Sequence, residues 1–224
     1  MKSALLFDID GTLLYAKGLG RPAFAEAFQA AYGTPVDLST ISFVGATDTA
    51  VIRSLAQTAG IPSTPAREEH FFIELTKRLE PRLKQGPLIV YPGVRSLLKK
   101  LQSQGYLLGV VTGNIRSIAW AKLLHAELAP YFSFGAYATD HENRDMIAKI
   151  AQTRAHTLGA SAKLLIGDTT KDVQAAHAIG VRCLAVTTGW VDADTLRIAG
   201  ADDLVDGFND PSLALAKIER LCHV

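Results

Sequence analysis

The sequence has few cysteines, no long apolar run and no excess of charge of either sign. Cys183 and Cys222 form neither a CxxC pair nor a zinc-ligand spacing, so no disulfide framework or thiolate metal site is expected. No stretch approaches the ~18 apolar residues of a membrane span, and two aspartates interrupt the apolar N-terminus, which excludes a signal-peptide core. Because 23 basic residues face 22 acidic ones, no general attraction to nucleic acid or anionic lipid follows. We therefore expect a soluble cytoplasmic protein that binds neither nucleic acid nor membrane.

Apolar runs and helical spacing alternate along most of the 224 residues. Short apolar runs predict buried strands at residues 4–7, 106–111, 163–166 and 181–186, with weaker strands at 133–137 and 204–205. Helical spacing predicts helices between them and after residue 211. Strands that alternate with helices of this length are typical of an α/β fold with a doubly wound parallel sheet.

The region after the first strand has a different pattern. Helical spacing begins at Pro22 and returns over residues 48–59 and 67–79, and no convincing strand lies between these helices. We therefore expect an α/β core made of residues 1–15 and 87–224, with an all-helical insert at residues 16–86.

Three aspartates follow predicted strands. Asp8 and Asp10 come directly after the first strand, and Asp168 follows the strand at 163–166. Ligands of doubly wound sheets bind beyond the carboxyl ends of the strands, so these carboxylates are expected to meet there. Like charges this close need a cation, and an all-oxygen ligand set favours Mg²⁺ over zinc.

A polar segment also follows the strand at 106–111. Thr112, Gly113 and Asn114 lead from this strand into a helix predicted at 115–126, which Asn114 can cap. Free backbone N–H groups at a helix N-terminus attract anions, and phosphate is the commonest of them. The segment is therefore a candidate phosphate-binding site.

Residues 7–13, 111–114 and 166–172 resemble, in order and in position, the first, second and fourth motifs of the haloacid dehalogenase-like hydrolases. The resemblance spans nearly the whole chain. It implies that the helical insert is similar to the mobile cap of that family. Within the insert, Gly45-Ala46-Thr47-Asp48 resembles a GxTD stretch of phosphoglycolate-phosphatase-like members.

The resemblance implies a role for each motif residue. Asp8 would be the nucleophile that forms an aspartyl-phosphate, and Asp10 would be the general acid and base. Asp8, the backbone carbonyl of Asp10, and Asp168 would bind Mg²⁺, while Asp172 would orient the metal's ligands. The phosphoryl group would be bound by residues 112–114.

The third motif departs from the family pattern. Many members have a lysine followed by proline, whereas this chain reads Asp140-His141-Glu142-Asn143-Arg144-Asp145. Arg144 is the best replacement for that lysine, and Lys149 is the alternative. In the insert, Arg21 is a candidate for binding an anionic part of the substrate. The role of Trp190, in a loop near the strand ends, stays open.

The leading hypothesis is a Mg²⁺-dependent phosphatase for a small phosphorylated metabolite similar to phosphoglycolate. A phosphomutase uses the same pair of aspartates and stays an alternative. A phosphonatase would need a lysine in the insert, where Lys77 and Lys84 lie in no recognisable motif. A dehalogenase is disfavoured because that branch lacks the second aspartate, here Asp10. A binding protein without activity is the alternative from another class, and the sequence does not address the oligomeric state.

Overall fold

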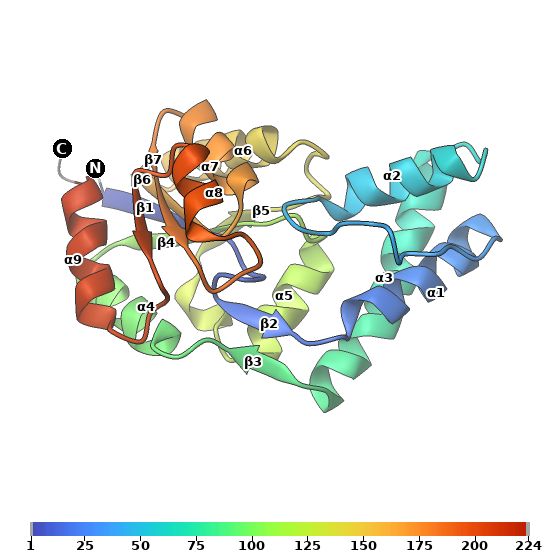
Figure 1. Ribbon diagram of the computed structural model, residues 1–224, viewed down its shortest axis with the longest axis horizontal. Helices are drawn as coiled ribbons and strands as arrows, with labels where there is room; N and C mark the ends of the chain where they lie inside the picture. Colours follow the sequence, from blue (N-terminus) through green and yellow to red (C-terminus); the bar gives the residue numbers. More distant parts are fainter. Residues whose placement is uncertain (1, 223–224) are drawn as a thin grey trace.

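The protein is built around a six-stranded parallel sheet, seen in a computed structural model that describes residues 2–222 (Figure 1). The strand order is β5–β4–β1–β6–β7–β8. Their bounds are Lys2–Phe7 for β1, Leu107–Val111 for β4, Phe134–Ala136 for β5, Ala160–Gly167 for β6, Arg182–Val186 for β7 and Asp203–Val205 for β8. All neighbouring pairs are parallel, and β1 lies at the centre between β4 and β6. The parallel sheet predicted from the sequence is thus confirmed.

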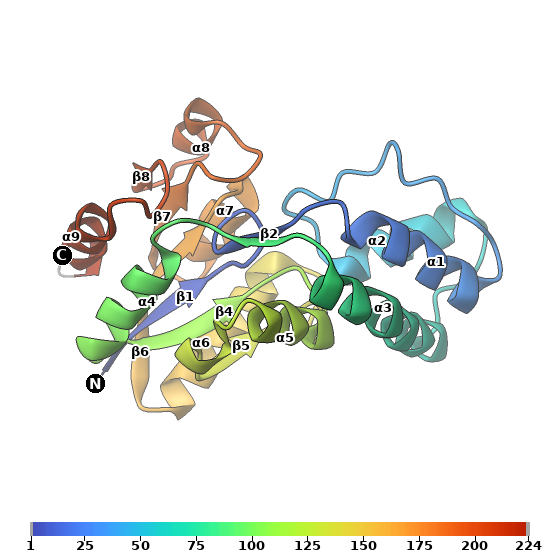
Figure 2. The same ribbon diagram turned by 90° about the horizontal axis from the view of Figure 1, so that it is seen from below.

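Helices cover both faces of this sheet, as the alternation of β1 requires (Figure 2). Leu5 and Phe7 of β1 belong to one apolar core, whereas Ala4 and Leu6 belong to the other. The first core is completed by α4 (Val94–Ser103), α5 (Arg116–His125), α9 (Pro211–Cys222) and the short 3-10 helix η1 (Ala129–Tyr131). The second is completed by α6 (Arg144–Thr157), α7 (Thr170–Ala178) and α8 (Ala193–Ile198).

Three helices of the expected insert lie together at one end of the molecule, on the right in Figure 1. They are α1 (Gly20–Tyr32), α2 (Asp48–Thr58) and α3 (Pro65–Gln85). Their apolar faces form a third core around Phe28, Ile52 and Phe71, which also receives Ile115 and Ile118 from the α5 region. We call residues 16–86 the helical insert. It therefore packs on the sheet-bearing part chiefly through α5.

The structure adds a feature that the sequence pattern missed. β2 (Leu14–Ala16) and β3 (Leu88–Val90) form an antiparallel pair where the chain enters and leaves the insert. Each has three residues, which is too short for periodicity to reveal. Helix α3 is also longer than expected, because it begins at Pro65 and continues past Pro81 to bury Leu83. None of the helices within residues 2–222 is both long and apolar enough to cross a membrane.

Candidate active site

The site forms where the three central strands end. Asp8 follows β1, Thr112 follows β4 and Asp168 follows β6, so adjacent parallel strands bring these residues to one edge of the sheet. All three side chains are buried. This is the place where ligands bind in doubly wound sheets, and it agrees with the convergence expected from the sequence.

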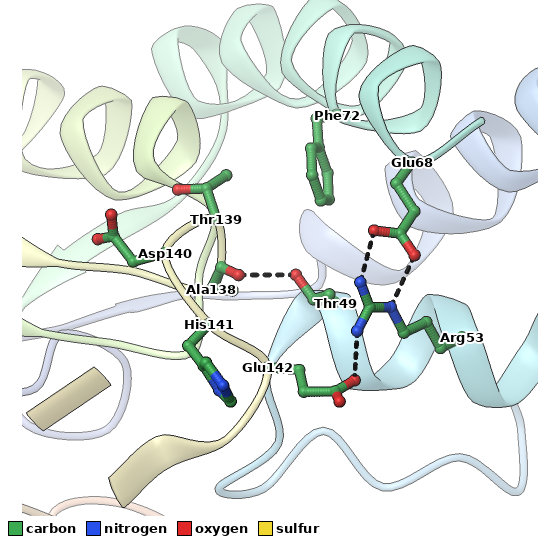
Figure 3. A pocket seen from close by; sticks show the side chains of 9 residues that line it. All are labelled: Thr49, Arg53, Glu68, Phe72, Ala138, Thr139, Asp140, His141 and Glu142. Carbon is green, nitrogen blue, oxygen red and sulfur yellow. Dashed lines mark hydrogen bonds and ion pairs between the residues drawn. The ribbon is translucent and has the colours of Figure 1, made fainter. Parts of the chain in front are cut away.

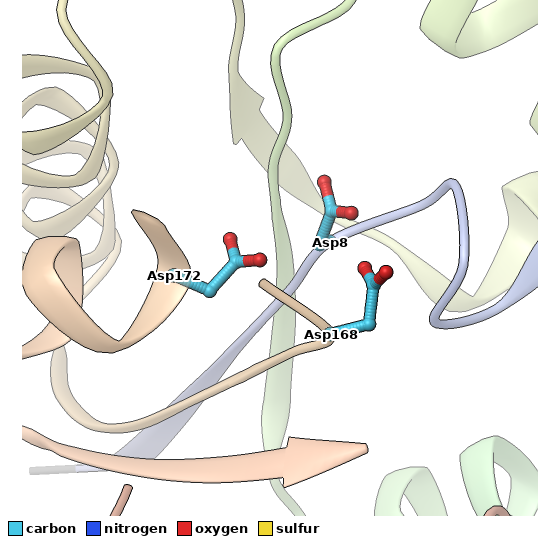
Figure 4. A group of neighbouring side chains, drawn as sticks. All are labelled: Asp8, Asp168 and Asp172. Carbon is cyan, nitrogen blue, oxygen red and sulfur yellow. The ribbon is translucent and has the colours of Figure 1, made fainter. Parts of the chain in front are cut away.

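Three carboxylates meet at this edge (Figure 4). One carboxylate oxygen from each of Asp8, Asp168 and Asp172 lies within 4.8 Å of the others. Asp168 accepts a 3.2 Å hydrogen bond from the Thr12 hydroxyl through Oδ1, while its Oδ2 is buried without a hydrogen-bond partner. A buried acceptor without a partner beside a second carboxylate is suited to a hard cation such as Mg²⁺.

The electrostatics of the cluster agree with this need for positive charge. Burial raises the pKa of Asp168 to about 9, and the charges of Asp8 and Asp172 add to the effect. Burial likewise raises the pKa of Asp8 to about 7, against the opposing charge of Arg144. A divalent cation bound here would favour the ionised carboxylates.

Two glycines allow the backbone to pack against Asp168. A Cβ atom on Gly11 would lie 2.2 Å from Oδ2 of Asp168, and one on Gly189 would lie 1.7 Å from it. Gly11 also has a φ of +84°, which favours glycine. The loop after β1 and the loop after β7 are therefore pressed against the metal-ligand candidate, and any side chain at these positions would displace it.

Arg144 is the cation that the structure brings to the cluster. Its Nη2 donates to Oδ1 of Asp8 at 2.7 Å, to Oδ1 of Asp172 at 2.6 Å and to the backbone carbonyl of Val111 at 3.2 Å. Burial lowers the pKa of Arg144, but the charges of Asp172 and Asp8 outweigh this and raise it, so the guanidinium stays charged. Asn143 caps helix α6 and thereby fixes the start of the helix from which Arg144 extends.

The other two candidate cations lie elsewhere. Lys149 is exposed on α6. Arg21 donates to the backbone carbonyls of Leu38 and Ile41 and stacks over the Phe43 ring at 4.9 Å. Its side chain therefore supports the loop before α2, and it is not among the residues that line the cavity beside Asp8.

Asp10 is held by a lysine that sequence reasoning missed. Nζ of Lys122, in helix α5, donates to Oδ2 of Asp10 at 2.6 Å and to Oδ1 of Asn114 at 2.6 Å. The Asn114 amide also donates to Oδ2 of Asp10, at 2.7 Å. The bonds from Lys122 and Asn114 to Asp10 both go to Oδ2, and neither goes to Oδ1. The carboxylate of Asp10 thus lies outside the Asp8–Asp168–Asp172 group, and the metal contact expected from Asp10 concerns only its backbone carbonyl.

The structure corrects the expectation that Asn114 caps the following helix. The cap position of α5 is Ile115, whose backbone N–H donates to the carboxylate of Asp48 at 2.8 Å. Asp48 also donates its own N–H to the Gly113 carbonyl at 2.7 Å. Asn114 instead binds Asp10, Lys122 and the Thr112 hydroxyl. The reason is that a carboxylate from the helical insert competes successfully for the helix N-terminus.

Further contacts tie the start of α2 to the loop that precedes α6. The hydroxyl of Thr47 donates to the Glu142 carbonyl, and that of Thr49 donates to the Ala138 carbonyl. Beside them lies a cavity of about 220 Å³, in which Arg53 bridges Glu68 of the insert and Glu142 (Figure 3). The insert therefore covers the strand ends in this structure.

A smaller cavity of about 60 Å³ contains the reactive candidates themselves. Its lining on the sheet side includes Asp8, Asp10, Thr112, Gly113, Asn114, Arg144, Thr169, Asp172 and Trp190. On the insert side it is lined by residues 43–46. The structure thus brings the motif residues expected from the sequence to one site, where Asp168 packs beneath the Gly11 and Gly189 backbones. The tentative substrate residue Arg21 and the alternative cation Lys149 are not in the lining.

A family profile described as haloacid dehalogenase-like hydrolase matches residues 5–186. The chain belongs to that family. It is 31% identical to "Probable phosphatase IndB" of Dickeya dadantii, over 94% of this chain and 92% of that protein. It is 27% identical to a phosphoglycolate phosphatase of Rhodobacter capsulatus, over 85% of this chain and 86% of that protein. The fold matches the crystal structure of a hydrolase from Pseudomonas syringae with a TM-score of 0.73 at 22% identity, over 97% and 99% of the two chains.

These relatives place the chain in the phosphoglycolate-phosphatase-like branch of the haloacid dehalogenase-like hydrolases. The chain is accordingly an enzyme of the phosphoric monoester hydrolase type. The resemblance stated from three short motifs is thereby confirmed over most of the chain.

Proposed function

We propose that the chain hydrolyses a small phosphate monoester in two steps, through an aspartyl-phosphate on Asp8, with Mg²⁺ as its cofactor. The observation that carries the proposal is the arrangement around Asp8. Arg144 lies 2.7 Å from one of its oxygens. Asp168, whose Oδ2 is buried without a hydrogen-bond partner, belongs to the same cluster of carboxylates. A fixed cation and an unfilled acceptor beside a carboxylate suit an anionic nucleophile that meets an anionic phosphoryl group.

In the first step, a carboxylate oxygen of Asp8 bonds to phosphorus and the bond from phosphorus to the alcohol oxygen breaks. Asp10 gives a proton to that alcohol oxygen. In the second step, Asp10 takes a proton from water, whose oxygen bonds to phosphorus, and the bond between phosphorus and Asp8 breaks. Lys122 and Asn114 both hold Oδ2 of Asp10, which leaves Oδ1 for the proton transfers.

The remaining site residues bind and orient. Asp8, Asp168 and the carbonyl of Asp10 would hold Mg²⁺, which when bound offsets negative charge on the phosphoryl group and the aspartates. Asp172 accepts from Arg144 through Oδ1 and from Thr169 through Oδ2, so both its oxygens already serve to orient neighbours. The Thr112 hydroxyl and the Gly113 N–H are proposed to donate to the phosphoryl oxygens.

The substrate is proposed to be small because the cavity is small. The names of the relatives make phosphoglycolate a reference compound for any assay. A division into core and mobile cap at residues 16–86 fits a reaction that needs water excluded in its first step.

The test is substitution of the nucleophile. Asp8→Asn keeps the shape of the side chain but removes the attacking charge, so hydrolysis of p-nitrophenyl phosphate should fall to background. Far-UV circular dichroism should show that the variant folds, and Asp206→Asn, which changes an exposed aspartate, is the matched control. Excess chelator should abolish the activity of the parent, and added Mg²⁺ should restore it. Activity of Asp8→Asn near that of the parent would contradict the covalent route.

A further inference from the structure

Among residues 2–222, those that line the active cavity from the insert carry no polar side chain. Its four residues are Phe43, Val44, Gly45 and Ala46, which lie opposite the carboxylates of the strand ends in the same cavity. Another apolar side chain of the lining is Trp190, from the loop after β7. The side of the cavity formed by the insert therefore offers an apolar surface.

The cationic side chains near the cavity already have hydrogen-bond partners in the protein. Arg144 and Lys122 bind carboxylates of the site. Arg21 donates to backbone carbonyls of the insert, and Lys171, whose stem packs near Gly45, donates to Gln174. Within residues 2–222, the lining of this cavity includes no cation other than Arg144.

The cation among the cavity's lining side chains within residues 2–222 is not free to pair with a substrate carboxylate. Asp8, Asp10 and Asp172 line the cavity, and Arg144 is shared by Asp8 and Asp172. A carboxylate placed against the insert side would lose water and find no charged side chain among residues 43–46 to replace it, which is costly. An uncharged group loses little on entering the same space.

Trp190 is exposed yet firmly placed. It is 55% exposed, although large aromatic side chains normally contribute most to stability when they are buried. Its loop is fixed by the hydroxyl of Thr188, which donates to the Gly11 carbonyl, and by that of Tyr91, which donates to the Thr188 carbonyl at 3.1 Å. Its ring also packs edge-to-face with Tyr15 at 5.4 Å. A fixed, exposed indole at the mouth of a cavity is suited to contact a ligand.

Phe43, on the insert side, is also held in place by its neighbours. Its ring packs edge-to-face with Phe24 at 5.1 Å, and the Arg21 guanidinium lies over it at 4.9 Å. Arg21, which the sequence suggested as an anion-binding residue, thus supports an apolar wall of the cavity. Two aromatic groups from separate elements therefore line one small space.

We propose that this site selects phosphate monoesters whose alcohol is uncharged and carries a flat apolar group, which packs against Trp190 and Phe43. The proposal rests on the phosphatase function proposed above and specifies its substrate class. It departs from a short anionic substrate such as phosphoglycolate.

Three esters of primary alcohols test the proposal: benzyl phosphate, 2-hydroxyethyl phosphate and phosphoglycolate. The last two differ only in a carboxylate replacing CH₂OH, so their comparison measures the effect of the charge. Burial of a phenyl ring should raise kcat/KM for benzyl phosphate at least about tenfold above that for 2-hydroxyethyl phosphate. Phosphoglycolate should be the poorest of the three. Phosphoglycolate ranking first would overturn the proposal and direct attention to Arg21 and Lys171.

Variants at Trp190 test the contact itself. Trp190→Ala should lower kcat/KM for benzyl phosphate by about 3–10-fold, chiefly through KM, and should reduce its preference over 2-hydroxyethyl phosphate. Trp190→Phe should restore most of that preference, whereas Ile198→Ala, which removes an exposed apolar side chain from α8, should leave it unchanged. Equal losses on all three esters in Trp190→Ala would overturn the contact.

The two proposals fail in different ways. If p-nitrophenyl phosphate and all three esters resist hydrolysis by the parent, the phosphatase function is wrong and the substrate class falls with it. If hydrolysis depends on Asp8 but phosphoglycolate is preferred, the phosphatase function stands and only the substrate class is wrong.

Discussion

The two sides of the active cavity are built from different chemistry. The strand-end side carries charged groups that hold one another, since Arg144 binds Asp8 and Asp172 while Lys122 binds Asp10. The insert side carries residues 43–46, which offer apolar side chains or none. The start of α2 binds the backbone of the sheet-bearing part through Thr47, Asp48 and Thr49. Arg53, further along α2, adds an ion pair with the Glu142 side chain.

This contrast indicates a division of labour between the two regions. Groups that fix one another by charged hydrogen bonds keep a constant geometry, which a reaction at phosphorus needs whatever the alcohol. Apolar residues on a separate segment contact only the alcohol. Changes on the strand-end side should therefore reduce activity on every ester, whereas changes on the insert side should alter the ranking of esters.

Among changes on the strand-end side that leave Asp8 in place, the largest effect on rate is expected at Arg144. Arg144→Ala should lower kcat by about 10²–10³ on all esters, the cost of losing one preorganised donor. Lys149→Ala, which changes an exposed lysine of the same helix, should cost less than about tenfold. Arg144→Lys should recover only part of the rate, because an ammonium cannot copy the guanidinium fork. Steady-state kinetics decide, and the opposite order of the two alanine variants would transfer the role to Lys149.

A second test concerns the metal. Asp168→Asn should raise the Mg²⁺ concentration for half-maximal activity by at least about 100-fold, since even indirect metal contacts are worth 10–100-fold. The parent should gain thermal stability on addition of Mg²⁺, because a ligand that binds only the folded state stabilises it. Asp168→Asn should lose that gain, and Asp206→Asn should keep it. A melting temperature of the parent that does not change with Mg²⁺ would contradict the assignment of Asp168 as a metal ligand.

The strand-end side could be predicted from the sequence because its geometry follows from the sheet. Residues directly after adjacent parallel strands must meet at one edge of the sheet. The meeting of Asp8, Thr112 and Asp168 could therefore be predicted without knowing how the side chains pack. Arg144 could be predicted for a similar reason, since it is the first residue of the helix that follows β5.

Lys122 was missed because it lies in the middle of a helix, where a lysine is ordinarily solvated. One signal was present: its neighbours Ala121 and Leu123 are apolar, and Ile118 and Ala119 lie one turn earlier. A lysine within such a stretch faces the core and needs a partner. The β2–β3 pair could not be found because strands of three residues are too short for periodicity to reveal. The role of Asp48 could not be found because it depends on how the insert docks on the sheet-bearing part.

Lys122 gives the third prediction. Lys122→Met should lower activity by roughly 10–100-fold, since a general acid that is no longer held in place loses part of its contribution. The loss should be greater for benzyl phosphate than for p-nitrophenyl phosphate, whose leaving group needs little protonation. Lys149→Met is the control, and unfolding curves should show that the variant stays folded. Equal losses on both esters would mean that Lys122 does not act through Asp10.

The smallest effect is expected where the two regions meet, at Asp48. Burial raises its pKa from 3.8 to about 6, although the N–H of Ile115 opposes the shift. A group whose pKa is higher in the folded state binds its proton more tightly there, so its contribution to stability is greatest below pH 4 and is lost as the pH rises to about 6. In Asp48→Asn the amide oxygen can still accept from Ile115 without titrating.

The free energy of unfolding of the parent should therefore fall relative to that of Asp48→Asn between pH 4 and pH 7. We expect a change of about 1–2 kcal/mol, somewhat below the full equivalent of the pKa difference because Asp48 is only partly buried. Urea unfolding of both proteins across this pH range measures the change. Subtracting the two free energies of unfolding cancels the titration of groups that the proteins share. A relative gain by the parent would mean that the ionised carboxylate is the stabilising form at the N-terminus of α5. Docking of the insert on the sheet-bearing part would then depend on that charge. The polar contacts of the insert would contribute more to this docking than its apolar lining suggests.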